Sequence, residues 1–172
     1  MRKLIVAALG TALMAGCASM PGAGPKAQAQ LQPTKGNSVT GTVTFEQRSG
    51  KTLVTAEVRG LTPNVEHAFH VHEKGDCSSG DGMSAGGHFN PRNAPHGKYD
   101  MGAHHAGDMP NLKADASGAA KISWEDDDLT VTDGPATVVG KAVIVHRDPD
   151  DYKSQPAGNA GPRLACGVIA RL

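Results

Sequence analysis

The chain has 172 residues, with three cysteines, eight histidines and only 3% aromatic residues. Seventeen basic and seventeen acidic side chains cancel at neutral pH, which argues against a nucleic acid or another polyanion as partner. The 22 glycines and 11 prolines favour one compact domain with many turns and long ordered loops.

The first residues have the features of an export signal. Arg2 and Lys3 precede an apolar run over 4–14 that is too short to span a bilayer, and Cys17 follows in the string LMAGC. This string resembles the lipobox of bacterial lipoproteins, which implies a lipoprotein signal peptide over residues 1–17 and acylation of Cys17. The alternative is a plain signal peptide that is cleaved a few residues later. Either signal exports the chain.

The residues after Cys17 suggest where the chain goes. No acidic residue follows at positions 18 and 19, which by resemblance favours a lipid anchor in the outer membrane over the inner one. We therefore expect the periplasmic side of the bacterial envelope, with a soluble periplasmic protein as the alternative. Residues 18–26 are small and rich in proline and glycine, which indicates a flexible tether before a domain over 27–172. Without the signal, the chain loses two basic residues and carries a charge of about −2.

The domain is predicted to consist of short β-strands. Runs with alternating apolar residues, separated by turn residues, predict strands at 27–31, 39–45, 53–58, 66–72, 120–124, 129–131, 142–146 and 166–170. No segment shows a convincing apolar helical stripe. The fold class is therefore all-β, as an antiparallel β-sandwich or flattened barrel.

One long segment interrupts this pattern. Residues 73–112 contain eight glycines and no sustained period, and structureless loops of that length are uncommon unless they are functional. Four of the eight histidines lie in this segment. We expect metal coordination to order it.

A pair of histidines stands immediately before that segment. His70 and His72 lie two residues apart on a predicted strand, so both side chains point to one face. His67 points to the other face, and we interpret it as a buried structural histidine. His146, at the end of another predicted strand, could lie beside the pair.

The remaining histidines complete two sets of metal ligands. Three imidazoles and one carboxylate suit zinc, and the candidates are His88, His96, His105 and Asp108. Four imidazoles suit copper, and the candidates are His70, His72, His88 and His146. One imidazole has two nitrogens, so His88 can bridge both metals if it loses its second proton. The alternatives are scattered surface histidines or a single zinc site.

The cysteines agree with export. Cys17 accounts for the odd one among three, which leaves Cys77 and Cys166 free to form a disulfide in an oxidising compartment. The alternative is two buried thiols.

Five strings carry a family resemblance, namely AFHVHEKGDC, SAGGHFNP, HHAGD, VIVH and GNAGPRLACGVI. In this order they resemble copper-zinc superoxide dismutase, and the resemblance covers residues 27–172. Cys77 follows His72 by five residues, which is similar to the bacterial periplasmic branch. The resemblance implies a Greek-key β-sandwich, an architecture of which this family is an established example. It also implies dismutation of superoxide to oxygen and hydrogen peroxide by alternate reduction and oxidation of copper, with zinc in a structural and tuning role.

The resemblance also assigns roles to single residues. It places His105 rather than His104 in the zinc set, and it makes Asp150 the carboxylate that hydrogen-bonds His70 and His96. Arg163 would attract and position the superoxide anion.

The same resemblance implies that His88 accepts a proton during turnover and that Cys77 and Cys166 are bridged. Trp124 and Tyr152 are assigned to packing.

Three rival functions remain at this stage: a copper carrier, a dismutase-like domain without activity, and a zinc hydrolase. A carrier would need neither Asp150, Arg163 nor a zinc set, and an inactive relative would lack copper ligands. A hydrolase would need an open three-ligand site with a neighbouring glutamate. The membrane is expected to be contacted only through the lipid anchor, and either a monomer or a homodimer is compatible with the resemblance.

Overall fold

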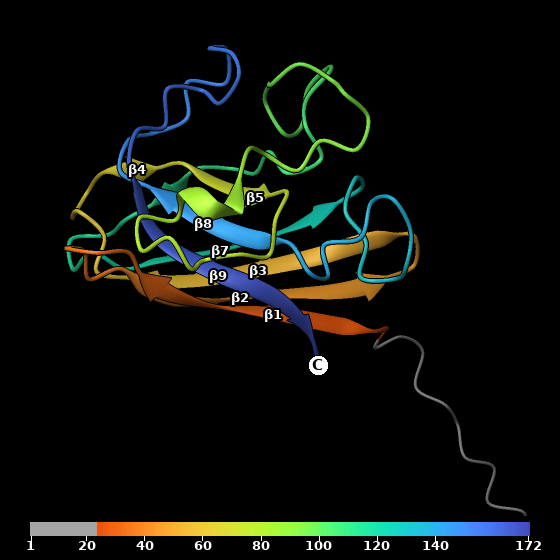
Figure 1. Ribbon diagram of the computed structural model, residues 1–172, viewed down its shortest axis with the longest axis horizontal. Coiled ribbons are helices and arrows are strands. Elements are labelled where there is room, and N and C mark those ends of the chain that lie inside the picture. Colours follow the sequence, from red (N-terminus) through yellow and green to blue (C-terminus); the bar gives the residue numbers. More distant parts are fainter. Residues whose placement is uncertain (1–23) are drawn as a thin grey trace, which may run out of the picture.

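The computed structural model describes residues 24–172 (Figure 1). These residues form nine strands and one 3-10 turn. The elements are β1 (Lys26–Pro33), β2 (Thr40–Arg48), β3 (Lys51–Arg59), β4 (Glu66–His67), β5 (Phe69–His72), the turn η1 (Met83–Ala85), β6 (Leu112–Lys113), β7 (Ala120–Asp126), β8 (Ala142–His146) and β9 (Arg163–Arg171).

Part of the expected organisation lies outside this range. The signal peptide, Cys17 and the first residues of the tether belong to residues 1–23, which the structure does not describe. Within residues 24–172, no helix has the length and apolar character needed to cross a membrane.

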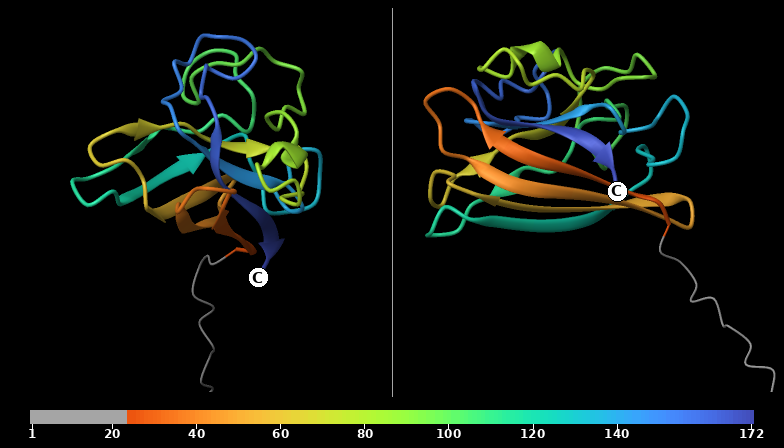
Figure 2. Two further views of the ribbon diagram at one scale, coloured as in Figure 1. Left: turned by 60° about the vertical axis from the view of Figure 1, so that its left-hand side comes forward. Right: turned by 60° about the horizontal axis from the view of Figure 1, so that its bottom comes forward.

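Seven strands form one antiparallel sheet in the order β5-β8-β9-β1-β2-β3-β7. The sheet curls over, so that β5 and β8 lie in a layer above β2 and β3 (Figures 1 and 2). Strand β9 returns from the end of the chain to pair with β1, which is a Greek-key connection. The expected all-β Greek-key sandwich is therefore confirmed.

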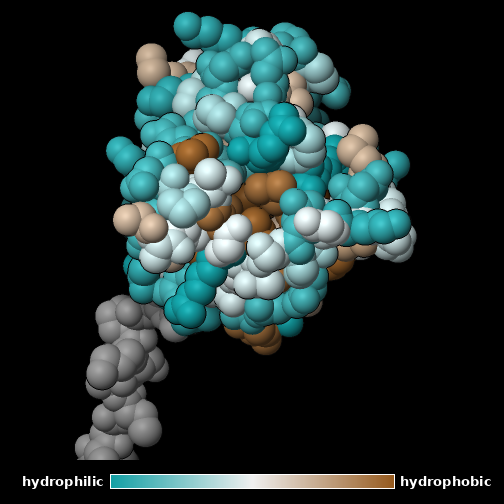
Figure 3. Space-filling model, turned by 90° about the vertical axis from the view of Figure 1, so that its left-hand side faces the viewer, coloured by the Kyte–Doolittle hydropathy of each residue, from teal (hydrophilic) through white to brown (hydrophobic). Residues whose placement is uncertain are grey.

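The core lies between the two layers. On β2, Val43 and Phe45 are fully buried while the neighbouring Thr42 and Thr44 are less so, as the alternation predicts. Val71 on β5 and Val143 on β8 close the core from the opposite layer. The face of the molecule shown in Figure 3 is mostly hydrophilic, with apolar side chains visible in its centre and in smaller groups around it.

The layer that contains β5 and β8 is buried on both faces. Beneath the loops, its outer face carries His70, His72, Ile144 and His146, which are 0–4% exposed. Two long loops cover this face: residues 73–111, here called the metal loop, and residues 147–162, here called the return loop. The loops therefore meet over a row of strand-borne histidines.

The metal loop is held by backbone pairing to the free edge of β5. The Val71 N–H donates to the Gly107 carbonyl at 2.9 Å, and the Val71 carbonyl accepts from the Phe89 N–H at 2.8 Å. A Cβ at Gly107 would lie 2.2 Å from the Val71 carbonyl oxygen, so this approach requires glycine. Backbone pairing, in addition to any metal, gives this loop its order.

The prediction of a single strand at 66–72 is wrong. The chain forms β4, which pairs with β6, and then β5, which pairs with β8. The change occurs at Ala68, whose N–H donates to the Asp148 carbonyl and whose carbonyl accepts from the His146 N–H, both at 2.9 Å. These two bonds to the end of β8 and the start of the return loop separate the two short strands.

The prediction of a strand at 129–131 is also wrong. The Asp126 carboxylate accepts from the N–H groups of Asp128 and Leu129 and so forms a turn, and Thr130 makes only an isolated bridge to Thr137. The alternation there reflects burial of Leu129 and Val131 against the core.

Candidate metal centre

The eight histidines do not scatter over the surface. Two sets of four buried residues each place one ligand atom per residue within 4.8 Å of the others. One set is His70, His72, His88 and His146, and the second is His88, His96, His105 and Asp108. The structure thus brings together every residue of both expected ligand sets, with His88 common to the two.

The first set has three members on strands, and their hydrogen bonds fix which nitrogen faces inward. The Nδ1 atom of His72 donates to the Gly86 carbonyl at 2.9 Å, and Nδ1 of His146 donates to the Gly161 carbonyl at 3.1 Å. A carbonyl oxygen only accepts, so both rings present the lone pair of Nε2 to the centre.

His70 is turned the other way. Its Nε2 donates to Oδ2 of Asp150 at 2.8 Å, so Nδ1 is the atom that faces His88 and His146. Among the described residues, three buried side-chain nitrogens have no hydrogen-bond partner: Nε2 of His67, which belongs to neither set, and, within the first set, Nδ1 of His70 and Nε2 of His88. Buried polar atoms are rarely left without a partner, so these two nitrogens indicate where a ligand binds.

The second set converges on one carboxylate oxygen. Oδ1 of Asp108 lies 2.8, 3.0 and 3.3 Å from the Nδ1 atoms of His88, His96 and His105. Its Oδ2 accepts the backbone N–H groups of Gly97 and His105. The carboxylate is therefore fixed on one side by loop backbone and faces three imidazoles on the other.

Distances between ring nitrogens fit metal ligands. The Nδ1 atoms of His88 and His105 are 3.3 Å apart, and the Nε2 atoms of His72 and His146 are 3.4 Å apart. Lone pairs that face one another repel unless a proton or a cation lies between them. A tetrahedral zinc site with Zn–N bonds of about 2.0–2.1 Å has ligand atoms about 3.3–3.4 Å apart. The residues present therefore fit a metal in both sets.

Asp150 connects the two sets. Its Oδ2 accepts from Nε2 of His70, and its Oδ1 accepts from Nε2 of His96 at 2.9 Å. Gly158, with φ +65°, lies against this contact, and a Cβ there would lie 1.8 Å from Oδ1 of Asp150. Carboxylates that orient ligating imidazoles in this way strengthen metal binding.

The electrostatics of the two sets differ. Burial lowers the pKa of His72 and His146 well below the ordinary value, and burial together with the neighbouring His70 lowers the pKa of His88 to about 4. These rings are neutral at pH 7, which is the form that binds a metal.

His96 behaves in the opposite way. Burial acts to lower its pKa, but the hydrogen bonds to Asp108 and Asp150 outweigh burial and raise the pKa to about 9. Two buried carboxylates thus attract positive charge, which favours a divalent cation as well as a proton.

Arg163 stands at the entrance to the first set. A pocket is lined by His72, His88 and His146 together with Arg163, Pro156 and Ala157. The guanidinium donates to the carbonyls of Gly82 and Gly86, each at 2.7 Å.

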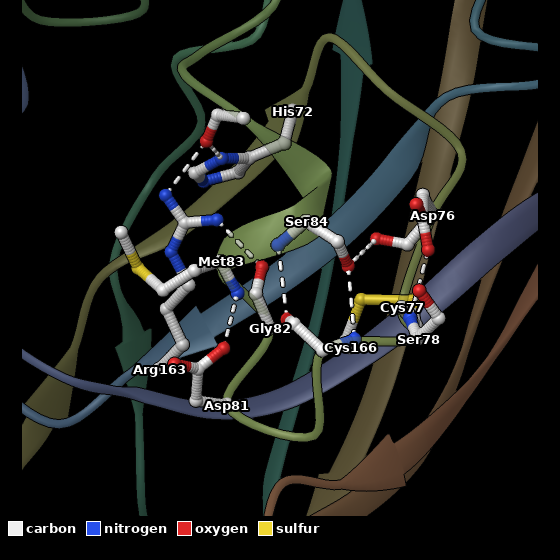
Figure 4. Close-up of a disulfide and its surroundings, with 12 residues drawn as sticks. His72, Asp76, Cys77, Ser78, Asp81, Gly82, Met83, Ser84, Arg163 and Cys166 are labelled. Atoms are coloured by element: carbon white, nitrogen blue, oxygen red, sulfur yellow. Dashed lines mark hydrogen bonds between the residues drawn. A yellow bond between two sulfur atoms is a disulfide. The ribbon is translucent and has the colours of Figure 1, made fainter.

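The Gly86 carbonyl also accepts from His72, so one carbonyl connects the arginine to a strand-borne histidine. Figure 4 shows Arg163 beside His72 on one side of the segment that carries Gly82.

The disulfide expected between Cys77 and Cys166 is present, with the two Cα atoms 5.8 Å apart. It attaches the first part of the metal loop to β9, close to Arg163 (Figure 4). Ala85 and Ile144 pack with it in a small apolar cluster.

Three other residues can now be placed. His104 turns away from the centre, with Nε2 3.3 Å from Asp128, while His105 points into it. His67 is fully buried and its Nδ1 donates to the His146 carbonyl at 2.9 Å, as expected of a structural histidine. The assignment of Tyr152 to packing was incomplete, because its hydroxyl accepts the Asn111 N–H at 3.0 Å.

Sequence reasoning missed the groups that hold the loops. The carbonyls of Gly82 and Gly86 cannot be recognised from a sequence, because any residue has a carbonyl. The roles of Asn111 and Gln155 could not be recognised from the sequence either, since their partners are backbone atoms of the opposite loop.

Fold and site together define a class of protein: a Greek-key β-sandwich whose outer face carries two sets of candidate metal ligands with one imidazole in common. Known proteins of this class match the chain over most of its length. A family model described as copper/zinc superoxide dismutase matches residues 39–169. The chain belongs to the copper-zinc superoxide dismutase family.

Individual relatives agree. Superoxide dismutase [Cu-Zn] 2 of Aquifex aeolicus is 43% identical over 148 residues, which cover 84% of this chain and 86% of the relative. The superoxide dismutase [Cu-Zn] of Saccharomyces cerevisiae is 45% identical over 139 residues, covering 76% and 89%. The crystal structure of the clock protein EA4 superposes with a TM-score of 0.77 at 40% identity, covering 86% of this chain and 94% of that one.

The reaction is thus the dismutation of superoxide to oxygen and hydrogen peroxide, and the cofactors are copper and zinc. Neither a copper carrier nor a zinc hydrolase is needed to explain the site.

Proposed function

We propose that His70, His72, His88 and His146 hold the copper and that His88, His96, His105 and Asp108 hold the zinc. The observation that carries this assignment is the chemistry of the two donor sets. The first set consists of imidazoles alone, which suits copper, and the second closes three imidazoles with a carboxylate, which suits structural zinc.

When bound, copper supplies a one-electron couple that accepts an electron from one superoxide and gives it to a second. Arg163 attracts the anion into the pocket and orients it beside His72, His88 and His146. Two carbonyls hold its guanidinium on one side, which leaves further N–H groups for the substrate.

His88 can hold one of the two protons that hydrogen peroxide needs, and solvent supplies the other. The buried Nε2 of His88 has no partner among the described residues, and Nδ1 lies 2.8 Å from Asp108. When copper does not occupy Nε2, this atom is the place where a proton can be carried inside the pocket, while Asp108 keeps the ring in position.

We also propose that the protein is exported as a lipoprotein on the periplasmic side of the bacterial envelope, attached to the outer membrane through Cys17. The apolar run, the string LMAGC and a disulfide between Cys77 and Cys166 support export. Cys17→Ser should release the protein from membranes without change in its activity. Membrane attachment that persists in this variant would contradict the anchor.

A homodimer is the assembly we propose. Val168 on β9 is 42% exposed, and this apolar side chain is one that a second copy could cover. Sedimentation of wild type and Val168→Lys tests this. A wild-type monomer at all concentrations would contradict it.

The metal assignment is tested on the full mature protein, loaded with both metals. Copper and zinc are counted, and superoxide removal is assayed on the same sample with and without cyanide. We expect one copper and one zinc per chain and fast activity that cyanide abolishes. Both metals bound without activity would contradict the proposed copper site and favour a copper-handling role.

A further inference from the structure

Two side-chain amides join the metal loop to the return loop. Nε2 of Gln155 donates to the His96 carbonyl, and Oε1 of Gln155 accepts the His96 N–H, both at 2.9 Å. Nδ2 of Asn111 donates to the Asp150 carbonyl at 3.1 Å, and Oδ1 accepts the Asp150 N–H at 3.0 Å. Each amide therefore binds both backbone polar groups of one residue.

The arrangement is reciprocal. Gln155 belongs to the return loop and binds His96 in the metal loop, whereas Asn111 ends the metal loop and binds Asp150 in the return loop. A carboxamide has one donor and one acceptor side by side, so it pairs with a residue's N–H and C=O as a neighbouring strand would. Neither His96 nor Asp150 lies in a strand.

The two residues held in this way contact each other. Oδ1 of Asp150 accepts from Nε2 of His96 at 2.9 Å, and both residues are less than 5% exposed. Backbone movement at either residue would therefore change the direction in which Nδ1 of His96 points toward Asp108. The amides fix both ends of this contact.

We propose that Gln155 and Asn111 are positioning residues of the metal centre, which keep His96 and Asp150 in the geometry needed to bind zinc. This inference rests on the proposed assignment of His96 to zinc. Both amides act through backbone, so they touch neither metal nor substrate. Their effect should be largest on zinc, because the strand-borne copper ligands His70, His72 and His146 have sheet partners of their own.

Gln155→Met is the first test. Methionine has nearly the same length and shape as glutamine but cannot form either hydrogen bond, and position 155 is exposed, so the core is not disturbed. The fully loaded enzyme is challenged with a chelator, and zinc and copper release are followed separately. We expect zinc release to be about 10–100-fold faster than in wild type, with little change for copper.

Gln47→Met is the matched control. Gln47 also holds a loop, since its side chain accepts the Val131 N–H and donates to the Lys51 carbonyl, but it lies away from the metal centre. This variant should melt at a lower temperature and release zinc at the wild-type rate. Equal acceleration by Gln155→Met and Gln47→Met would show general loosening and overturn the proposal, as would a wild-type zinc release rate in Gln155→Met.

Cobalt in place of zinc gives a second measurement. The visible spectrum of Co²⁺ reports ligand geometry, and we expect it to change in Gln155→Met and in Asn111→Leu but not in Gln47→Met. Unchanged spectra in both loop variants would contradict a positioning role. A wild-type protein that binds no zinc would contradict the zinc assignment itself, and this inference with it.

Discussion

The two halves of the metal centre are built in different ways. Three of the four proposed copper ligands, His70, His72 and His146, lie on β5 and β8, whose backbones pair within the sheet. The three zinc-side residues other than His88 lie in the metal loop, outside any strand. The copper half is therefore set mainly by the sheet, whereas on the zinc side only Asp108 is held against β5 and His96 depends on contacts between loops.

This difference determines what each half depends on. A side chain on a paired strand has its position fixed by the sheet even when neighbouring loops move. His96, by contrast, depends on Gln155 for both backbone bonds and on Asp108 and Asp150 for its ring. We expect the zinc half to be lost first whenever the loops are loosened.

The largest effect should come from the covalent attachment of the metal loop. Cys77→Ser removes the disulfide to Cys166, which closes a long loop, and should lower the free energy of unfolding by about 2–5 kcal/mol. Chemical denaturation of the loaded enzyme measures this. A native thiol titration that finds both cysteines free in wild type would contradict the bridge.

Asp150→Asn should show most clearly that the copper half and the zinc half respond differently. Asparagine keeps the shape but loses the charge and one of the two acceptor oxygens that serve His70 and His96. Zinc affinity should fall about 10–100-fold, and copper affinity should fall much less because His70 is held by β5.

Competition with a chelator measures both affinities. Asp148→Asn, at an exposed carboxylate two residues away that pairs with Arg147, is the control and should change neither. Equal losses of copper and zinc in Asp150→Asn would contradict the difference between the halves.

Competition with protons should also give zinc and copper affinity different pH dependences. In the protein alone, the pKa of His96 is about 9, so zinc must displace a proton at pH 7, whereas the pKa of His72 and His146 is far below neutral and copper displaces none there. Zinc affinity should therefore rise about tenfold per pH unit from pH 7 and level off near pH 9. With each metal added alone, His88 has no second metal to bridge and keeps its ring proton, so copper affinity should stay nearly flat over that range. Parallel slopes in separate titrations of the two metals would contradict this.

The smallest effect concerns the entrance and not the ligands. Arg163→Ala should leave both metals bound and slow turnover about tenfold, with a weaker dependence on ionic strength, because attraction of the anion is lost. The control is Arg147→Ala, at an exposed arginine paired with Asp148. An unchanged rate in Arg163→Ala would remove its role in guiding substrate.

The sequence allowed prediction of the copper half more directly than of the zinc half. Alternation alone placed His70 and His72 on one face of a strand and Val71 on the other, as observed. For the loop residues, residue type and spacing suggested a zinc set, but the choice of His105 over His104 came from the family resemblance.

Other features were beyond sequence reasoning because they depend on backbone contacts across loops. The break at Ala68 arises from bonds to Asp148 and His146, which are distant in sequence. The amides of Asn111 and Gln155 are similarly invisible, since nothing in the residue type says which backbone they bind. Alternation indicated a strand at 129–131, but the Asp126 carboxylate accepts from the Leu129 N–H and the chain forms a turn there.

Crystals of the loaded protein would test the account most directly, with anomalous diffraction recorded at the copper and zinc edges. We expect a copper peak among His70, His72, His88 and His146 and a separate zinc peak among His88, His96, His105 and Asp108. A single mixed position, exchanged metals, or a zinc peak away from Asp108 would contradict it.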